Sequence, residues 1–397
     1  MTDSGAAGAD RRLPRAVVGL LIVAAIGGGI GFGALLASAW SEDRPVVAQA
    51  SPSPVPSSAV PTAAATPSPT TRPTPAPTPV TVPAPLTGLP VGPEAATWHP
   101  VAVMVDDHRD ARPQSGFNAA AIVWQAPAEG GIPRYMLVLQ DALPAAVGPI
   151  RSARQYYIDW ASEWNAVYVH VGGSPEALAT LRAEGRGQLV WNADEFRWGG
   201  THIWRVPERP APHNTYSDGE HLRALSAAVG ASDGPIEPAW AFGPAARPAA
   251  RPVGTTLTVT YPYETVEYRY DADTNTYRRH IDGSAEPQAD AADGRVVAPT
   301  NVVILRMRFG ALNDGHPEKH RLDAADIGSG EAIISTNGRI VTGTWSKASV
   351  TAPTLLFGPD GAPVTLTAGQ TFVQVIALSY PFAVTEGTVP SRGIQLP

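Results

Sequence analysis

The chain has 397 residues, of which 44% are hydrophobic and 16% charged, and its formal net charge is −7. A net negative charge offers no basic field to a nucleic-acid backbone, which argues against nucleic-acid binding. The chain has no cysteine, which excludes disulfides, thiolate zinc sites, a catalytic thiol and a lipid-modified N-terminal cysteine. Gly and Pro together make up about a fifth of the residues, against a usual ~12%, so part of the chain is not expected to fold into a domain.

Residues 16–40 form an apolar run without an ionisable side chain. A helix of this length reaches ~37 Å, enough to cross a ~30 Å hydrocarbon core. Arginines precede the run and acidic residues follow it, so the positive-inside rule keeps residues 1–15 in the cytoplasm. The sequence therefore predicts a single-pass cell-membrane protein with extracytoplasmic C-terminal domains. A cleaved signal peptide is the alternative, since residues 37–39 have the small-x-small form of a cleavage site, although the apolar run is longer than a signal core.

Residues 41–85 are rich in Pro, Ser, Thr and Ala, and from residue 45 onward their only charge is Arg72. This composition cannot form a hydrophobic core and favours extended polyproline II segments. We expect a disordered stalk that carries the domains beyond it into or along the cell wall. An inert linker is the alternative.

The folded part is expected to begin at residue 86, where short apolar runs alternate with turn signals. In residues 86–235, strands are predicted at 101–105, 121–124, 135–139 and 166–170, and helices at 151–164 and 175–184. The strand runs lack polar alternation, which is typical of strands buried on both faces. This pattern predicts an N-terminal α/β domain, followed by a Pro- and Gly-rich linker at 236–254.

Residues 255–397 have a different pattern, dominated by β-branched and aromatic residues. Strands are predicted at 255–261, 266–270, 276–280, 301–309, 330–335, 339–345, 354–357 and 371–377. Asn337-Gly338 and Asp360-Gly361 are typical hairpin turns. The second domain is therefore expected to be mainly antiparallel β, and the whole ectodomain α+β.

Several phrases of the folded part resemble the YerB-like envelope protein family. The N-terminal phrases are 85–90 (PLTGLP), 102–108 (AVMVDDH), 111–116 (ARPQSG), 129–134 (EGGIPR), 148–154 (GPIRSAR) and 168–175 (YVHVGGSP), and the C-terminal phrases are 338–345 (GRIVTGTW), 352–354 (APT) and 369–371 (GQT). The resemblance implies an extracytoplasmic bacterial protein with two domains of uncharacterised function, in a family that includes lipoproteins and has links to cell-wall synthesis. This chain departs from the lipoprotein pattern because it lacks the acylated cysteine and has an apolar run in its place.

Polar residues follow three predicted strands of the N-terminal domain. They are Asp106, Asp107 and His108 after the first strand, Glu129 after the second, and His170, Gly172, Gly173 and Ser174 after a later one. In an α/β sheet, such residues line the usual ligand crevice at the carboxyl ends of the strands. The alternative is structural: Asp and Ser cap helices or turns, and the histidine is a hydrogen-bonded core residue. No ligand spacing fixes a metal geometry, and no cofactor or metal is expected.

Arg151 and Arg154 are three residues apart at the start of the predicted helix, so they are expected to share a face beside its free N–H groups. With Arg112 and Arg134 they could hold a carboxylate or phosphate. The alternative is internal pairing with nearby carboxylates. A serine triad with Ser152 or Ser174 can be written, but no nucleophile-elbow motif supports it.

The loop around His213 and Asn214 also contains Trp198 and Trp204, a mixture that can grip sugars or peptides or serve as packing. The sequence as a whole favours a membrane-anchored binding or scaffold protein that contacts cell-wall polymer or wall-synthesis proteins. The alternative is an envelope hydrolase, with or without a metal, that uses Asp106, Asp107, Glu129 and His170. A small-molecule receptor is a third possibility.

Overall fold

The computed structural model describes residues 80–182 and 188–390. The expected membrane span at 16–40 and most of the expected stalk lie outside the described residues. Within the described ranges, no helix is both long and apolar enough to cross a membrane. The ordered part begins before residue 86, because β1 (Val82–Pro83) pairs with β2 (Pro90–Val91). The last residues of the expected stalk therefore belong to the folded structure.

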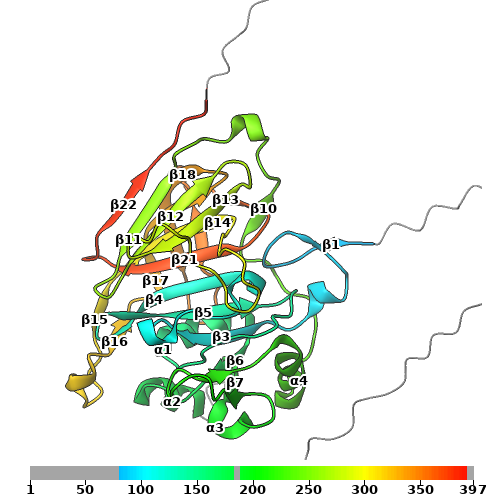
Figure 1. The fold of residues 1–397 in the computed structure, drawn as a ribbon, viewed down its shortest axis with the longest axis vertical. Helices are drawn as coiled ribbons and strands as arrows, with labels where there is room; N and C mark the ends of the chain where they lie inside the picture. The colour runs from blue at the N-terminus through cyan, green and yellow to red at the C-terminus, as the bar shows by residue number, and fades with distance from the viewer. Residues whose placement is uncertain (1–79, 183–187, 391–397) are drawn as a thin grey trace, which may run out of the picture. The chain divides into compact units, whose positions relative to one another are not determined.

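A ten-stranded mixed sheet runs through both halves of the chain (Figure 1). Its strand order is β19 (Leu355–Phe357), β18 (Arg339–Lys347), β17 (Gly328–Thr336), β14 (Asn301–Met307), β21 (Thr371–Ala377), β4 (Ile122–Glu129), β5 (Ile132–Leu139), β3 (Val101–Asp106), β6 (Val167–His170) and β7 (Trp191–Asp194). β21 pairs in parallel with β4, so the sheet passes from the C-terminal half to the N-terminal half without a break.

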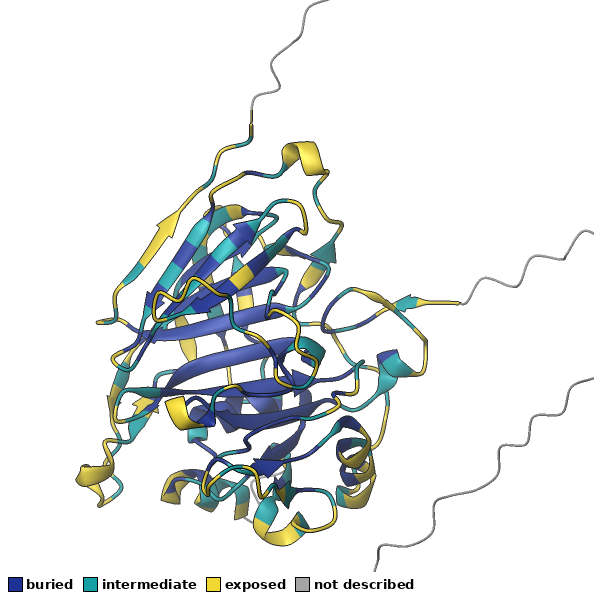
Figure 2. Ribbon diagram, in the orientation of Figure 1, coloured by how far each residue is buried: buried dark blue, intermediate teal, exposed yellow. Residues whose placement is uncertain are grey.

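The continuously apolar strands are buried on both faces, as their sequence predicts. Every residue of β3 and of β21 is buried, and the middle of the sheet is the darkest part of Figure 2. The predicted strands of both halves are present at or near their expected positions. Their hydrophobic side chains form the two cores that lie on either side of the sheet.

Each face of the sheet has its own cover. On one face lie α1 (Gln155–Ala161) and α2 (Pro175–Arg182), and Trp160 of α1 stacks on Trp124 of β4 with ring centroids 4.7 Å apart. On the other face, α4 (Gly219–Val229) contributes Leu222 and Leu225 to the core. A second sheet covers the rest of that face.

The second sheet is antiparallel and has four strands. Their order is β13 (Thr276–Ile281), β12 (Thr265–Asp271), β11 (Thr256–Thr260) and β22 (Phe382–Thr385). Leu257 and Val259 of β11 are buried while their neighbours along the strand are half-buried, which is the alternation expected of a sheet with one face on the core. The remaining α-helix of the described residues is α3 (Glu195–Trp198). The remaining strands form the short pairs β8 (Trp204–Arg205) with β9 (Thr215–Tyr216), β10 (Ala241–Gly243) with β20 (Thr365–Thr367), and β15 (Phe309–Ala311) with β16 (Leu322–Ala324).

The fold is mostly β-sheet with few helices, so the expected division into α/β and antiparallel β is correct only in part. In the N-terminal half, β4 and β5 are joined through Gly130 and Gly131, and so short a connection can only make an antiparallel hairpin. In the C-terminal half, β14 pairs in parallel with β21, and β10 with β20. The expected linker at 236–254 contains β10, which is one strand of a pair.

Candidate functional site

The strand-end residues of the N-terminal half lie along one edge of the ten-stranded sheet, as expected. Asp106 ends β3, Glu129 ends β4 and His170 ends β6. β3 is parallel to β6, and β5 is antiparallel to both β3 and β4, so all three ends point the same way. Hydrogen bonds and ion pairs nevertheless divide these residues into separate groups.

The first group, called here the Asp106 cluster, consists of Asp106, His108, Arg151 and His213. Asp106 Oδ2 accepts a hydrogen bond from His213 Nδ1 at 2.7 Å and lies 2.9 Å from Arg151 Nε. The other oxygen accepts the backbone N–H of His108 at 3.1 Å. The rings of His108 and His213 stack with centroids 5.0 Å apart. Because a carboxylate only accepts, His213 Nδ1 carries the proton of this bond, and Nε2 is the nitrogen that offers a lone pair in the neutral form of the ring.

Two segments of the chain place this cluster beside β3: the extended segment at 149–154 and the loop at 206–214. The backbone N–H of Arg151 donates to Met104 of β3 at 2.9 Å, and its carbonyl accepts from Val171 after β6 at 3.1 Å. His213 lies in the loop between β8 and β9. Asn214 supports that loop, since its Oδ1 accepts from Arg205 Nη1 at 3.1 Å.

The Asp106 cluster is partly open to solvent. Its carboxylate is almost covered, with 4% of the side chain exposed, whereas the exposed fractions are 23% for Arg151 and 35% for His108. The partly exposed guanidinium of Arg151 can bind an anion, and the partly exposed imidazole of His108 can bind a metal together with the buried imidazole of His213.

The second group is a closed set of ion pairs around Glu129. Its Oε1 accepts from Arg134 Nη2 at 2.9 Å and its Oε2 from Arg154 Nε at 2.7 Å. Burial raises the pKa of Glu129, but the two guanidinium groups more than reverse this and lower it to about 2. Arg134 also donates to the Ser152 carbonyl at 2.9 Å. Arg134 and Arg154 are therefore engaged inside the protein.

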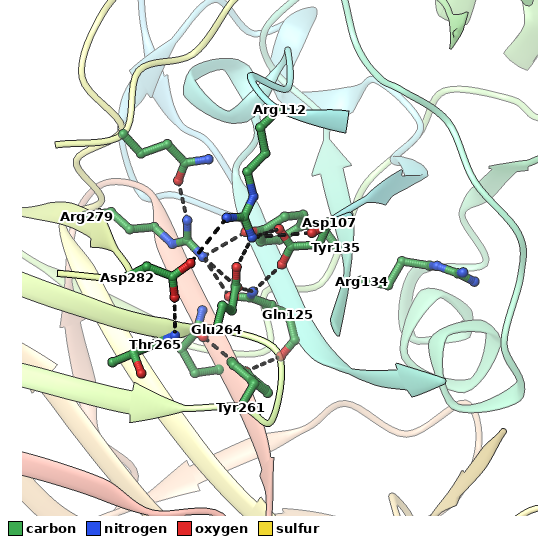
Figure 3. Close-up of polar contacts among 12 residues, drawn as sticks. Asp107, Arg112, Gln125, Arg134, Tyr135, Tyr261, Glu264, Thr265, Arg279 and Asp282 are labelled. Atoms are coloured by element: carbon green, nitrogen blue, oxygen red, sulfur yellow. Dashed lines mark hydrogen bonds and ion pairs between the residues drawn. The ribbon is translucent and has the colours of Figure 1, made fainter. Parts of the chain in front are cut away.

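The third group is a buried network between the two halves of the chain (Figure 3). Gln125 of β4 donates its side-chain amide to Asp107 Oδ2 and Glu264 Oε1, both at 2.6 Å. Arg112 contacts both carboxylates, and Arg279 of β13 donates to Gln125 Oε1 at 2.9 Å. Burial raises the pKa of Asp107 well above its ordinary value, and the neighbouring Glu264 raises it further. Arg134 lies to the side of this network in Figure 3.

His170 and the glycine-rich turn after it have structural contacts. The ring nitrogens of His170 lie 2.7 Å from the Gly172 carbonyl and 2.8 Å from Asn192 Oδ1, and the residue is fully buried. Ser174 Oγ accepts the Ala177 N–H at 3.3 Å in the first turn of α2. Gly173 packs so closely on Ala153 that a Cβ would lie 3.1 Å from the alanine Cβ. The contacts of His170 therefore match the structural alternative, in which this histidine is a hydrogen-bonded core residue, and not a residue that lines an open crevice.

The expectation that Arg151 and Arg154 share a helix face is wrong. α1 begins at Gln155, and Arg154 has the extended backbone of a capping residue. The preceding segment is extended because Ala153 N–H donates to Gly172 O at 2.9 Å, as part of its pairing with the turn after β6. The two arginines therefore diverge, one to Asp106 and the other to Glu129.

Sequence reasoning placed Asp106 and His213 in separate candidate sites and missed their pairing. The two residues are 107 positions apart, and no spacing rule connects them. It also missed Gln125, Glu264 and Arg279. In the sequence, each of these three is a polar or charged residue next to an apolar or aromatic run. The same pattern is common on protein surfaces, so it does not identify a buried network.

The fold and these contacts describe a two-part β-rich protein, and comparison with known proteins gives its family. Residues 86–232 match the model described as "Protein of unknown function (DUF3048) N-terminal domain", and residues 257–373 match the model of the corresponding C-terminal domain. The chain belongs to this two-domain, YerB-like family, which confirms the resemblance seen in the sequence.

Two relatives support this assignment. The chain is 29% identical over 300 residues to "Putative lipoprotein YerB" of Bacillus subtilis (strain 168), covering 74% of this chain and 86% of the relative. The crystal structure of the YerB protein from Bacillus subtilis matches with a TM-score of 0.66 and 26% identity, over 76% of this chain and 99% of that one.

Proposed function

We propose that this protein is a membrane-anchored, extracytoplasmic binding protein of the bacterial cell envelope, and that it binds anionic groups of cell-wall polymer through Arg151. The name of the relative, "Putative lipoprotein YerB", supports an envelope location. The apolar run at 16–40 supports an anchor, and the Pro-rich run at 41–85 supports a spacer between membrane and wall. Residues 86–397 would then face outward and meet the polymer.

The observation that supports this proposal is the set of contacts that the Arg151 guanidinium makes. Its Nε lies against Asp106, while among residues 80–182 and 188–390 neither terminal nitrogen has a hydrogen bond or ion pair. Arg112, Arg134 and Arg154 each contact a carboxylate through a terminal nitrogen. Arg151 thus keeps its terminal nitrogens available, and a planar guanidinium can donate both to one carboxylate or phosphate.

A sedimentation assay tests the proposal. The full-length chain in detergent is mixed with purified, insoluble wall polymer, and the bound fraction is measured for the unmodified protein, Arg151→Ala and Arg306→Ala. Arg306 is the matched control, because its side chain is 25% exposed but its terminal nitrogens are engaged by Glu331 and the Leu378 carbonyl. We expect Arg151→Ala to weaken binding about tenfold, as for the loss of one charged hydrogen-bonding group, and Arg306→Ala to have no effect.

Equal binding by the three proteins would reject Arg151 as the contact. No retention of the unmodified protein would reject the polymer as ligand, and a wall-synthesis protein would then be the partner to test.

A hydrolase is the second candidate, because Asp106 and His213 are paired as in an acid–base site. The carboxylate holds the Nδ1 proton, so Nε2 can take a proton from a nucleophile. The sedimentation assay distinguishes the two functions when the supernatant is also analysed. Soluble polymer fragments that are lost in His213→Gln would support the hydrolase, and binding without fragments would support the binding protein.

A further inference from the structure

We propose that His108, Asp110 and His213 form a binding site for a divalent cation of the zinc class. One ligand atom from each residue, an imidazole nitrogen or a carboxylate oxygen, lies within 4.8 Å of the other two. Across the described ranges 80–182 and 188–390, this is the only group of three His, Asp or Glu side chains with that spacing. Two imidazoles and one carboxylate suit zinc and its neighbours better than magnesium or calcium, which prefer oxygen ligands.

The distance between the first two ligands fits tetrahedral coordination. His108 Nδ1 lies 3.5 Å from Asp110 Oδ2. At zinc–ligand bonds of ~2.1 Å, two neighbouring ligands of a tetrahedral ion are about 3.4 Å apart. The spacing of these two atoms therefore suits one cation. The rings of His108 and His213 stack with 18° between their planes, so the more exposed His108 ring has to turn before the lone pairs of both rings point at one ion.

The side chains around the site allow this movement. The Asp110 side chain is 71% exposed and can turn toward the cation. His108 Nδ1 now accepts the Asp110 backbone N–H at a long 3.2 Å, and a cation at Nδ1 would replace that bond.

Asp106 holds the His213 ring in the way that a carboxylate holds a metal-binding histidine. Metal-binding histidines usually donate their second ring N–H to a carboxylate, which fixes the ring and directs the other nitrogen to the metal. His213 has this arrangement, since Nδ1 is held by Asp106 at 2.7 Å and the residue is only 8% exposed. Within the described part of the chain, Nε2 has no hydrogen-bond partner. The same carboxylate offsets the positive charge of Arg151, which would otherwise repel a cation.

The cation site goes beyond the proposed polymer contact and does not depend on it. The three ligands are different side chains from Arg151. Three protein ligands leave the fourth tetrahedral position open for water or another small ligand, as in zinc sites that keep an exchangeable position.

Zinc titration of the metal-free, full-length chain in detergent, without a polyhistidine tag, tests this site. Calorimetry reports affinity and stoichiometry, and Co²⁺ in place of Zn²⁺ reports tetrahedral coordination by its visible absorption. The variants are His108→Gln, Asp110→Asn and His213→Gln. Asp110→Asn is the least disruptive, because the side chain is exposed. The control is His221→Ala, because His221 also pairs with an aspartate, Asp218, at 2.8 Å but is not part of the group.

We expect one Zn²⁺ per chain and at least tenfold weaker binding in each of the three variants, with His221→Ala unchanged. The tetrahedral Co²⁺ absorption should disappear in His213→Gln. The site would be rejected if the unmodified chain shows no saturable Zn²⁺ binding, or if Asp110→Asn and His213→Gln bind Zn²⁺ as tightly as the control. Neither result bears on retention by wall polymer in the Arg151 assay, so failure of one proposal is distinguishable from failure of the other.

Discussion

Arg278 and Arg279 are neighbours on β13, yet the side chain of Arg279 is fully buried while that of Arg278 is 52% exposed. Adjacent residues of a strand point to opposite faces, so one arginine reaches the surface and the other the network between the two halves. Arg279 donates to the Tyr135 hydroxyl at 2.8 Å and to Gln125 Oε1 at 2.9 Å, and its pair with Glu264 is 3.9 Å long.

The two arginines give a matched test of that network. Arg279→Met leaves two buried carboxylates, Asp107 and Glu264, with Arg112 as the remaining cation. Loss of one partner from a buried ion pair typically costs about 3–5 kcal/mol, whereas Arg278→Met should cost less than about 1 kcal/mol. Denaturant unfolding measures both. Equal losses of unfolding free energy would show that the network does not stabilise the contact between the halves.

Two buried carboxyl groups predict a pH-dependent stability. Burial raises the pKa of Asp326 to about 7 and that of Asp159 to about 6. Both pKa values are above those of the unfolded chain, so the folded protein binds these two protons more tightly than the unfolded chain does. The resulting contribution to the free energy of unfolding is complete below about pH 4 and is lost as the pH rises through 6 and 7. Between pH 5 and pH 8, ionisation of Asp326 alone should lower the free energy of unfolding by about 2.5 kcal/mol.

Asp326→Asn should therefore flatten the stability profile between pH 5 and pH 8 by about that amount. Unfolding curves across this range measure the slope, and Asp360→Asn, at an exposed turn, is the control. A profile that is the same in Asp326→Asn and in the unmodified protein would contradict the assignment.

The two lysines of the chain should differ sharply in reactivity. Lys347 is fully buried and donates to Glu163 Oε1 at 3.0 Å and to the Ala352 carbonyl at 2.6 Å, whereas Lys319 is exposed. An amine-reactive acylating agent should modify Lys319 in the folded protein and Lys347 only after unfolding. Mass spectrometry of the digested protein measures both sites, and early modification of Lys347 would refute its burial.

Two predicted hairpin turns provide a paired test of packing. Gly338 and Gly361 both have positive φ, at +71° and +76°, so alanine is strained at either position. A Cβ at Gly338 would also lie 2.3 Å from the Tyr270 ring, while nothing lies within 4 Å at Gly361. Gly361→Ala should cost about 1 kcal/mol, and Gly338→Ala about 1–3 kcal/mol more. Thermal unfolding measures the difference, and similar costs would place Tyr270 elsewhere.

Local sequence patterns predicted the strands but not which strands pair across the two halves. The apolar run of β3 and the Asn337-Gly338 turn have strong local signals, and both are present. The parallel pairing of β21 with β4 joins residues about 250 positions apart, and neither strand encodes its partner. The candidate site has the same limitation, because local sequence does not encode contacts between distant residues. The apolar run before it predicted that Asp106 ends a strand, but only the fold shows that His213 is its partner.

Amide hydrogen exchange of the full-length protein, with and without wall polymer, tests the central claim most directly, because it locates the contact without a substitution. Polymer bound through Arg151 should slow exchange at residues 106–109, at 151–154 and in the loop at 206–214, all around the Asp106 cluster. The surface around Arg306 should exchange at the same rate in both samples. Protection confined to other surfaces, or none at saturating polymer, would contradict the proposed function.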